Sequence, residues 1–234
     1  MVTWNNLDTL ASYQELKDTA KVNLAEIMTG ENGAERVKNY SIPMAAGFTY
    51  NYAAKAVDDN VLAALVKLAD EAQLADKFKE LYNGAVINTG ENRLVLHHMT
   101  RGQLGDAVTA DGVDKRAFYV EQQNRIADFA NKVHAGEITN AAGEKFTTVV
   151  QIGIGGSDLG PRAMYLALEN WAKKNNTFKM EAKFISNVDP DDAAAVLNSI
   201  DVAHSIFVLV SKSGTTLETL TNESFVKDAL KNAG

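Results

Sequence analysis

A threefold alternation of strand and helix after Phe146 constrains the fold of this chain more than any other feature. Short runs rich in β-branched and aromatic residues are each followed by a segment with helical periodicity. Strands are predicted at 149–154, 182–187 and 205–210, and helices at 161–174, from Pro190 onward and at 216–232. Connections of this type join parallel strands with right-handed crossovers. We therefore expect an α/β fold in which helices cover both faces of a parallel sheet of three strands.

Two local patterns in this half lead to more specific predictions. Asp189 followed by Pro190 is typical of a helix start, because the aspartate can accept backbone hydrogen bonds and proline suits the first helical position. Residues 205–210 are almost wholly apolar, which predicts a strand that is buried on both faces.

Up to about Gly143 the spacing of apolar residues is mostly helical. Helices are predicted at 13–27, 61–68, 74–83 and 115–133, the second with Asp59 or Asn60 as its N-cap. Four side chains of the last helix are predicted to point inward: Phe118, Ile126, Phe129 and Val133. Because the pattern changes at 140–143, we expect a helical N-terminal region, residues 1–143, and an α/β domain, residues 144–234.

The amino-acid composition excludes several kinds of binding partner for this chain. The chain contains 23 Lys and Arg against 30 Asp and Glu, a net charge of −7. An acidic chain lacks the basic surface that nucleic-acid binding requires, although a single loop can still bind a small phosphorylated ligand. The absence of cysteine excludes disulfides and thiolate metal sites. No apolar run reaches the ~20 residues of a membrane span, so we expect a cytoplasmic protein with neither a nucleic-acid nor a membrane partner.

The first predicted strand runs into a glycine-rich turn at residues 153–161. In open parallel sheets ligands bind beyond the carboxyl ends of the strands, where glycines let the backbone come close to them. The following helix offers free N–H groups and the positive end of its dipole, which suits an anion. Ser157 can cap this helix or donate its hydroxyl to a ligand.

Two phosphate-binding motifs do not fit this turn. A dinucleotide-binding turn needs a third glycine where this chain has Asp158, whose carboxylate would repel a pyrophosphate. A P-loop needs a lysine after its last glycine, whereas Gly160 is followed by Pro161. A site for a monophosphate or for sugar hydroxyls remains, together with the alternative of a tight turn that binds nothing.

A second polar loop follows the third predicted strand and enters the last helix. It consists of Ser211, Lys212, Ser213, Gly214, Thr215 and Thr216. Thr215 and Glu218 fit a capping box, so one interpretation is a capped helix start with an exposed lysine. The cluster of hydroxyls with one cation at a helix N-terminus favours a phosphate site. Because both loops follow parallel strands, we expect them at the same edge of the sheet, one for the phosphate and the other for sugar hydroxyls.

These two loops carry a family resemblance. Residues 150–161, Val-Gln-Ile-Gly-Ile-Gly-Gly-Ser-Asp-Leu-Gly-Pro, closely resemble a signature of the glucose-6-phosphate isomerase family. Residues 211–219, Ser-Lys-Ser-Gly-Thr-Thr-Leu-Glu-Thr, resemble the phosphate loop of that family. Residues 87–93, 96–101 and 186–189 are similar to further segments in the same order. The resemblance implies that residues 144–234 form a sugar-isomerase (SIS) domain with a flavodoxin-like sheet.

The resemblance also implies an activity, the reversible interconversion of glucose 6-phosphate and fructose 6-phosphate in glycolysis and gluconeogenesis. It implies no metal and no organic cofactor. Gly156 and Ser157 carry over as sugar contacts. The phosphate contacts carry over to Ser211, Lys212, Ser213, Gly214, Thr215 and Thr216. For a complete chain the family implies a homodimer.

One part of the family's site has no match in this chain. The resemblance places the catalytic base, the ring-opening residues and the arginine that stabilises the enediolate beyond Gly234. We therefore expect a fragment that holds the phosphate-binding half of the site and is inactive by itself. The alternative is a non-catalytic regulatory SIS module that binds a sugar phosphate. His97, His98 and His204 are interpreted as structural residues.

Overall fold

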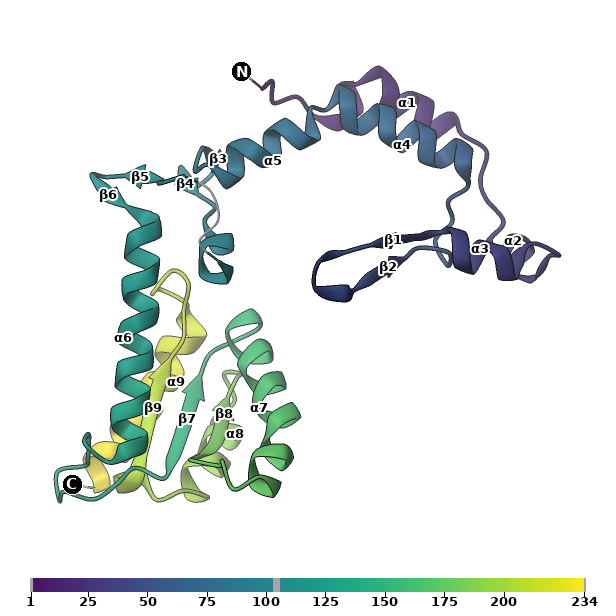
Figure 1. The fold of residues 1–234 in the computed structure, drawn as a ribbon. Coiled ribbons are helices and arrows are strands. Elements are labelled where there is room, and N and C mark those ends of the chain that lie inside the picture. Colours follow the sequence, from purple (N-terminus) through teal and green to yellow (C-terminus); the bar gives the residue numbers. More distant parts are fainter. Residues whose placement is uncertain (1, 103–105, 234) are drawn as a thin grey trace. The chain divides into compact units, whose positions relative to one another are not determined.

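The computed structural model describes residues 2–102 and 106–233, and the chain divides into two compact units, Met1–Val120 and Glu121–Gly234 (Figure 1). The division falls within the long helix α6 (Lys115–Ala135), ahead of the change expected at 140–143. It falls there because the second half of α6 lines a groove together with the sheet of the second unit. The assignment of 1–143 as a helical region and 144–234 as an SIS domain stays a prediction.

Short helices make up most of the first unit. They are η1 (Leu7–Thr9), α1 (Ala11–Asp18), α2 (Leu24–Thr29), α3 (Gly33–Asn39), η2 (Ala45–Gly47), α4 (Asp59–Glu71), α5 (Leu74–Tyr82) and η3 (His97–Arg101). The prediction of one helix over 13–27 is wrong, because local hydrogen bonds separate α1 from α2. The Thr19 hydroxyl donates to the Glu15 carbonyl at the end of α1 (3.0 Å). Asn23 begins α2, since its Oδ1 accepts the Glu26 N–H (3.3 Å).

The ends of α4 and α5 follow from their terminal residues. Asp58 is the N-cap of α4, because its Oδ1 accepts the Val61 N–H at 2.8 Å. The predicted caps Asp59 and Asn60 are therefore wrong, and both lie inside the helix. The predicted end of α5 near residues 83–84 is confirmed: Gly84 adopts a left-handed φ of 82°, which stops a helix at little cost for glycine.

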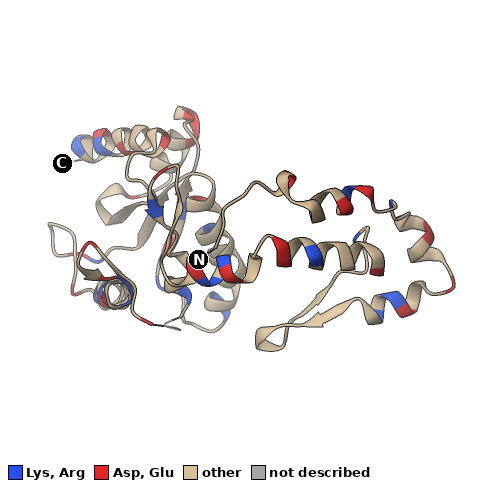
Figure 2. Ribbon diagram, turned by 90° about the horizontal axis from the view of Figure 1, so that it is seen from above, with Lys and Arg blue, Asp and Glu red and all other residues tan. Residues whose placement is uncertain are grey.

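Three short antiparallel pairs, which the helical periodicity did not predict, complete the described part of the first unit. They are β1 (Ser41–Pro43) with β2 (Thr49–Asn51), β3 (Val86–Asn88) with β4 (Arg93–Leu94), and β5 (Thr109–Ala110) with β6 (Val113–Asp114). The β1–β2 hairpin carries no charged residue (Figure 2). At its base the buried Arg36 side chain donates to the carbonyls of Ala53 (2.8 Å) and Val57 (2.6 Å).

The second unit is the predicted α/β fold, which is confirmed. Its three described strands are β7 (Thr148–Ile152), β8 (Glu181–Ile185) and β9 (Ser205–Leu209). They are parallel and lie in the order β8-β7-β9. The helices α7 (Gly156–Lys174), α8 (Pro190–Asn198) and α9 (Leu217–Ala233) follow them in turn (Figure 1). The predicted start of α8 is also confirmed, because Asp189 Oδ1 accepts the Asp191 N–H at 2.9 Å.

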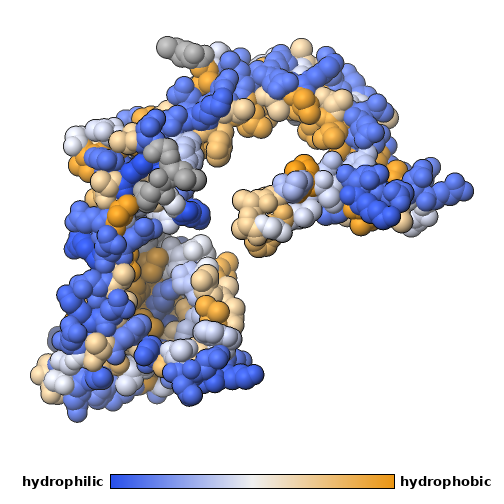
Figure 3. All heavy atoms as spheres, in the orientation of Figure 1, coloured by the Kyte–Doolittle hydropathy of each residue, from blue (hydrophilic) through white to orange (hydrophobic). Residues whose placement is uncertain are grey.

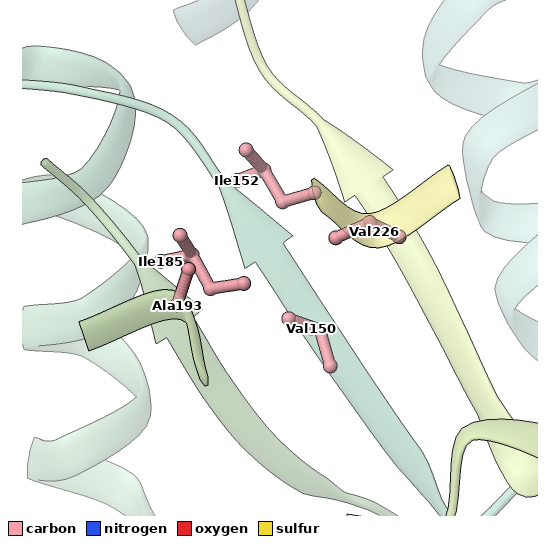
Figure 4. Packing of buried hydrophobic residues seen from close by; sticks show 5 residues of the cluster. All are labelled: Val150, Ile152, Ile185, Ala193 and Val226. Carbon is pink, nitrogen blue, oxygen red and sulfur yellow. The ribbon is translucent and has the colours of Figure 1, made fainter. Parts of the chain in front are cut away.

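Side chains alternate between the two faces of the sheet, and the strand register aligns them across strands. On one face Ile152 pairs with Ile185 across β7 and β8, and both are fully buried together with Val150. Ala193 of α8 and Val226 of α9 pack against them (Figure 4). The other face lines a groove with α6 and α7, where hydrophobic side chains are visible (Figure 3). Helices therefore lie on both faces of the sheet, as predicted.

Two predictions about burial are wrong. β9 is an edge strand, and Val208 and Leu209 near its end are 39% and 41% exposed, so it is not buried on both faces. In α6 only Val133 of the four predicted inward residues is buried. The other three, Phe118, Ile126 and Phe129, are exposed. Apolar composition alone does not show which of these side chains another element covers.

No helix in residues 2–102 and 106–233 is both long and apolar enough to cross a membrane.

His204 joins two acidic side chains at the amino end of β9. Its Nδ1 lies 2.8 Å from Asp201 Oδ2 and its Nε2 lies 3.0 Å from Glu144 Oε2. The hydrogen bond with Asp201, reinforced by Glu144, raises the pKa of His204 above its ordinary value of 6.5. The same hydrogen bond lowers the pKa of Asp201 below its ordinary value. A doubly protonated ring can donate to both carboxylates, so protonation of His204 stabilises the folded state.

We expect stability to fall as the pH rises from about 6.5 through the raised pKa of His204, because the folded state then loses its extra proton. Below pH 6.5 this contribution is complete, until Asp201 takes up a proton at a pH below its ordinary range. Urea unfolding at a series of pH values measures the effect. His204→Gln is the control and should flatten the curve above pH 6.5. An unchanged slope in that variant would contradict the assignment.

Candidate functional site

The glycine-rich turn connects β7 to α7 and differs from the prediction in one respect. α7 begins at Gly156, so Pro161 lies inside the helix and not at its first position. The chain leaves the strand through Gly155, whose φ of 56° and ψ of −120° are readily accessible only to glycine. The first turn of the helix then closes with the Asp158 N–H donating to the Gly155 carbonyl (3.0 Å).

A second glycine in this turn is required by close packing. A Cβ atom on Gly153 would lie 2.7 Å from the Ser157 carbonyl oxygen and 3.0 Å from the Ser157 Cβ. The backbone at the end of β7 therefore passes directly against the first turn of α7. Any side chain at this position would push Ser157, a predicted sugar contact, away from the strand.

Asp158, whose charge disfavours a dinucleotide site, forms an ion pair within its own helix. Its carboxylate is buried and lies 3.0 Å from the guanidinium of Arg162. That guanidinium in turn lies over the Phe184 ring of β8, 4.9 Å from its centroid. An acidic side chain in the first turn also interacts favourably with the helix dipole. Asp158 thus has a structural role at the start of α7.

The second loop, residues 211–216, is held together by its own hydroxyl groups. Ser211 Oγ lies 2.8 Å from Thr216 Oγ1 and accepts the Gly214 N–H at 3.0 Å. Ser213 Oγ accepts both the N–H (3.2 Å) and the hydroxyl (3.0 Å) of Thr215. Gly214 has a left-handed φ of 74°, which lets the loop turn sharply before α9. Four hydroxyls and the start of a long helix are therefore concentrated in six residues.

The structure brings the two loops to the same edge of the sheet, as their order along the chain predicts. β7 and β9 are neighbours, and their pairing continues beyond the last strand residue, because the Val210 N–H donates to the Ile152 carbonyl (2.8 Å). Gly156 and Ser157 therefore follow β7, and the 211–216 loop follows β9, its neighbour in the sheet. The roles of these eight residues in binding stay predictions.

Two polar residues of α9 lie beneath this edge and were not singled out from the sequence. Thr219 and Asn222 are both almost completely buried, and the Thr219 hydroxyl and the Asn222 Oδ1 have no hydrogen-bond partner among the described residues. Asn222 Nδ2 donates to the carbonyl of Asn187, which follows β8 (3.1 Å). Their spacing of three, on the same helix face as Val226, is the signal that could have identified them.

The ring of His98 has structural partners, which agrees with its interpretation. His98 Nε2 lies 3.1 Å from the Tyr82 carbonyl, and its ring stacks on that of Tyr82 at 4.4 Å. The backbone carbonyl of His97 accepts from the Arg101 guanidinium (2.9 Å), and the structural role of the His97 ring stays a prediction. Within the described ranges, no group of three or more His, Asp or Glu side chains could hold a metal ion.

Comparisons with known proteins identify similar chains. The chain is 56% identical to glucose-6-phosphate isomerase of Treponema denticola and 50% identical to that of Treponema pallidum, over 99% and 100% of its length. It spans only 44% of the length of either relative. A crystal structure of a glucose-6-phosphate isomerase from Chlamydia trachomatis superposes with a TM-score of 0.76 at 35% identity, covering 98% of this chain and 43% of that one.

A family model described as phosphoglucose isomerase matches residues 51–234, which include both loops and extend well into the first unit. Together with the two relatives and the shared fold, this match shows that the chain belongs to the phosphoglucose isomerase family.

Proposed function

We propose that this chain supplies the sugar-phosphate-binding part of a glucose-6-phosphate isomerase. The observation that carries the proposal is the clustering of four hydroxyls in the 211–216 loop, beside the glycine turn and at the carboxyl edge of neighbouring parallel strands. Relatives that match the whole chain carry the name glucose-6-phosphate isomerase. Glucose 6-phosphate and fructose 6-phosphate are the proposed ligands.

The 211–216 loop is proposed to bind the phosphate. A phosphate dianion has three oxygens that accept several hydrogen bonds each, and hydroxyls can rotate to donate to it. The hydroxyls that now bond to one another, such as Ser211 with Thr216, can redirect their protons toward an anion. Lys212 adds a positive charge, and the start of α9 adds the positive end of a helix dipole.

The glycine turn is proposed to hold the sugar. Gly156 brings backbone close to the ligand without a side chain, and the half-buried Ser157 offers a hydroxyl beside it. Because the turn and the loop follow adjacent strands, one ligand can reach both. The family match also extends ahead of the sheet to residue 51, which disfavours the alternative of a small regulatory sugar-phosphate module.

We also propose that the chain alone does not isomerise its ligand. Aldose–ketose isomerisation moves a proton between C1 and C2 through an enediolate, and it needs a base within hydrogen-bond reach of that proton. The residues carried over from the family bind phosphate and sugar and supply no such base. A coupled assay that detects turnover by the pure chain would contradict this proposal. A cytoplasmic location and a homo-oligomeric state of the complete enzyme belong to the same proposal.

Binding should depend mainly on the phosphate group, because the loop supplies more donors for the anion than the turn supplies for the sugar. We expect glucose 6-phosphate and inorganic phosphate to shift the same amide resonances of residues 211–216 in an NMR titration and to compete with each other. Free glucose at the same concentration should shift none of them. Equal shifts with glucose would contradict the phosphate site.

Three variants separate the contributions of charge and of a hydroxyl to phosphate binding in this titration: Lys212→Ala, Ser211→Ala and Ser224→Ala. The first should weaken phosphate binding more at low salt than at high salt, because screening shortens the reach of the charge. The second should weaken binding at any salt concentration. Ser224, whose hydroxyl donates to the Thr221 carbonyl on α9, is the matched control and should leave binding unchanged.

A further inference from the structure

Proline inside α7 leaves one helical carbonyl without its usual donor. In an α-helix each carbonyl accepts from the N–H four residues later. Four residues after Ser157 stands Pro161, which has no N–H, and it lies within the helix. The Ser157 carbonyl must therefore find another donor or remain unsatisfied at the place where the sugar is proposed to bind.

The donor comes from the strand that precedes the turn. Gln151 Nε2 donates to the Ser157 carbonyl at 2.7 Å, across the glycine turn. Gln151 is the single strongly polar residue within the central run Val149–Ile152, since its neighbours there are valine and isoleucine. In the register it lies between Phe184 of β8 and Val208 of β9. A glutamine amide surrounded by apolar strand neighbours needs such a partner.

The Ser157 carbonyl is thus fixed from two directions. Gln151 holds it by a hydrogen bond, and the Cα of Gly153 packs so close that a Cβ would lie 2.7 Å from the same oxygen. Gln151 lies in β7 and Gly153 directly follows it, and β7 is the central strand, paired with β8 on one side and with β9 on the other. The position of the Ser157 peptide is therefore set by the strand and not by helix propagation alone.

We propose that Gln151 is a positioning residue for the sugar end of the ligand, acting through Ser157; this inference rests on the function proposed above. Without the amide donor, the Ser157 carbonyl would turn toward water or toward another donor. The Ser157 hydroxyl and the N–H groups of the same turn would move with it. The phosphate loop follows β9 and has its own hydrogen bonds, so it should not be affected.

Gln151→Met tests this role, because methionine has nearly the same shape but no donor. NMR titrations of the 234-residue chain with glucose 6-phosphate and with inorganic phosphate give two dissociation constants. We expect the dissociation constant for glucose 6-phosphate to rise about threefold to tenfold, which corresponds to the loss of one hydrogen bond. For inorganic phosphate we expect a change of less than about twofold. A general loss of stability would weaken both ligands alike and so would not change their ratio.

A second substitution gives a rescue that a merely structural role does not predict. Pro161→Ala restores an N–H four residues after Ser157, so the double variant Gln151→Met, Pro161→Ala should recover most of the lost affinity. Pro161→Ala alone should change little, because the carbonyl already has a donor. Gln122→Leu, on α6 in the groove at the same face of the sheet, is the control for removing an amide and should leave the ratio unchanged.

The outcomes separate the two proposals. If the unmodified chain binds neither ligand, the proposed function is overturned and this inference with it. If it binds both, and the ratio of the two constants is the same in Gln151→Met, the positioning role alone is overturned. Failure of Pro161→Ala to restore affinity would also overturn it, because the restored N–H replaces the donor that Gln151 is proposed to supply.

Discussion

Ile185→Ala should lower the free energy of unfolding of the second unit by about 2–5 kcal/mol, the usual cost of such a truncation in a packed core. Ile185 is fully buried on β8 and belongs to the cluster with Val150, Ile152, Ala193 and Val226 (Figure 4). These five residues come from two strands and two helices, so no one neighbour can move to fill the cavity. Urea unfolding followed by circular dichroism gives the change from the shift in midpoint.

Ile126→Ala is the matched control for this truncation. It removes the same atoms in the same unit, but Ile126 lies on α6 and is 68% exposed. The expected change is within about 0.5 kcal/mol, because little apolar surface is returned to water. Ile185→Val should lie between the two, at about 0.5–1.5 kcal/mol. Equal effects of the two alanine variants would contradict the burial that the structure assigns to Ile185.

Gly153→Ala should destabilise the second unit by about 1–3 kcal/mol, the cost of overpacking, and should also weaken glucose 6-phosphate binding. The added methyl would lie 2.7 Å from the Ser157 carbonyl oxygen, which is backbone and cannot move by rotating a side chain. Either β7 or the first turn of α7 must shift. Thermal unfolding measures the stability, and the NMR titration measures the binding.

Gly160→Ala is the control from the same glycine-rich segment. Gly160 lies within α7, and a Cβ built on it meets nothing within 4 Å. Alanine there should stabilise the chain by up to about 1 kcal/mol, because it restricts the unfolded chain and favours the helix. If both substitutions had the same sign, close packing at Gly153 would not explain the need for glycine.

The strands and most helices of the second unit could be predicted from the sequence because each depends on short-range patterns. The β-branched run before Gly153 and the Asp189-Pro190 helix start act within a few residues, and the structure has both elements. The placement of both polar loops at one edge also followed, since parallel strands with helical crossovers leave their carboxyl ends on the same side.

Elements that depend on partners elsewhere in the chain were not predictable in this way. The antiparallel pairs of the first unit have only two or three residues per strand, too few for a period of two to stand out. The start of α7 before Pro161 was missed for a related reason. The general preference of proline for the first helical turn holds unless another group serves the freed carbonyl, and here Gln151 does so from the preceding strand.

Three features follow from residues that are close together along the chain: the order of strands and helices after Phe146, the glycine turn and polar loop that carry the proposed site, and the family resemblance. Other features are visible only in the folded chain: β7 is central and β9 is an edge strand, Val133 is buried while Ile126 is exposed, and Gln151 bonds to Ser157. The physical reason is that burial, strand order and side-chain pairing are set by contacts between separate elements, and an apolar or polar residue type is compatible with several such arrangements.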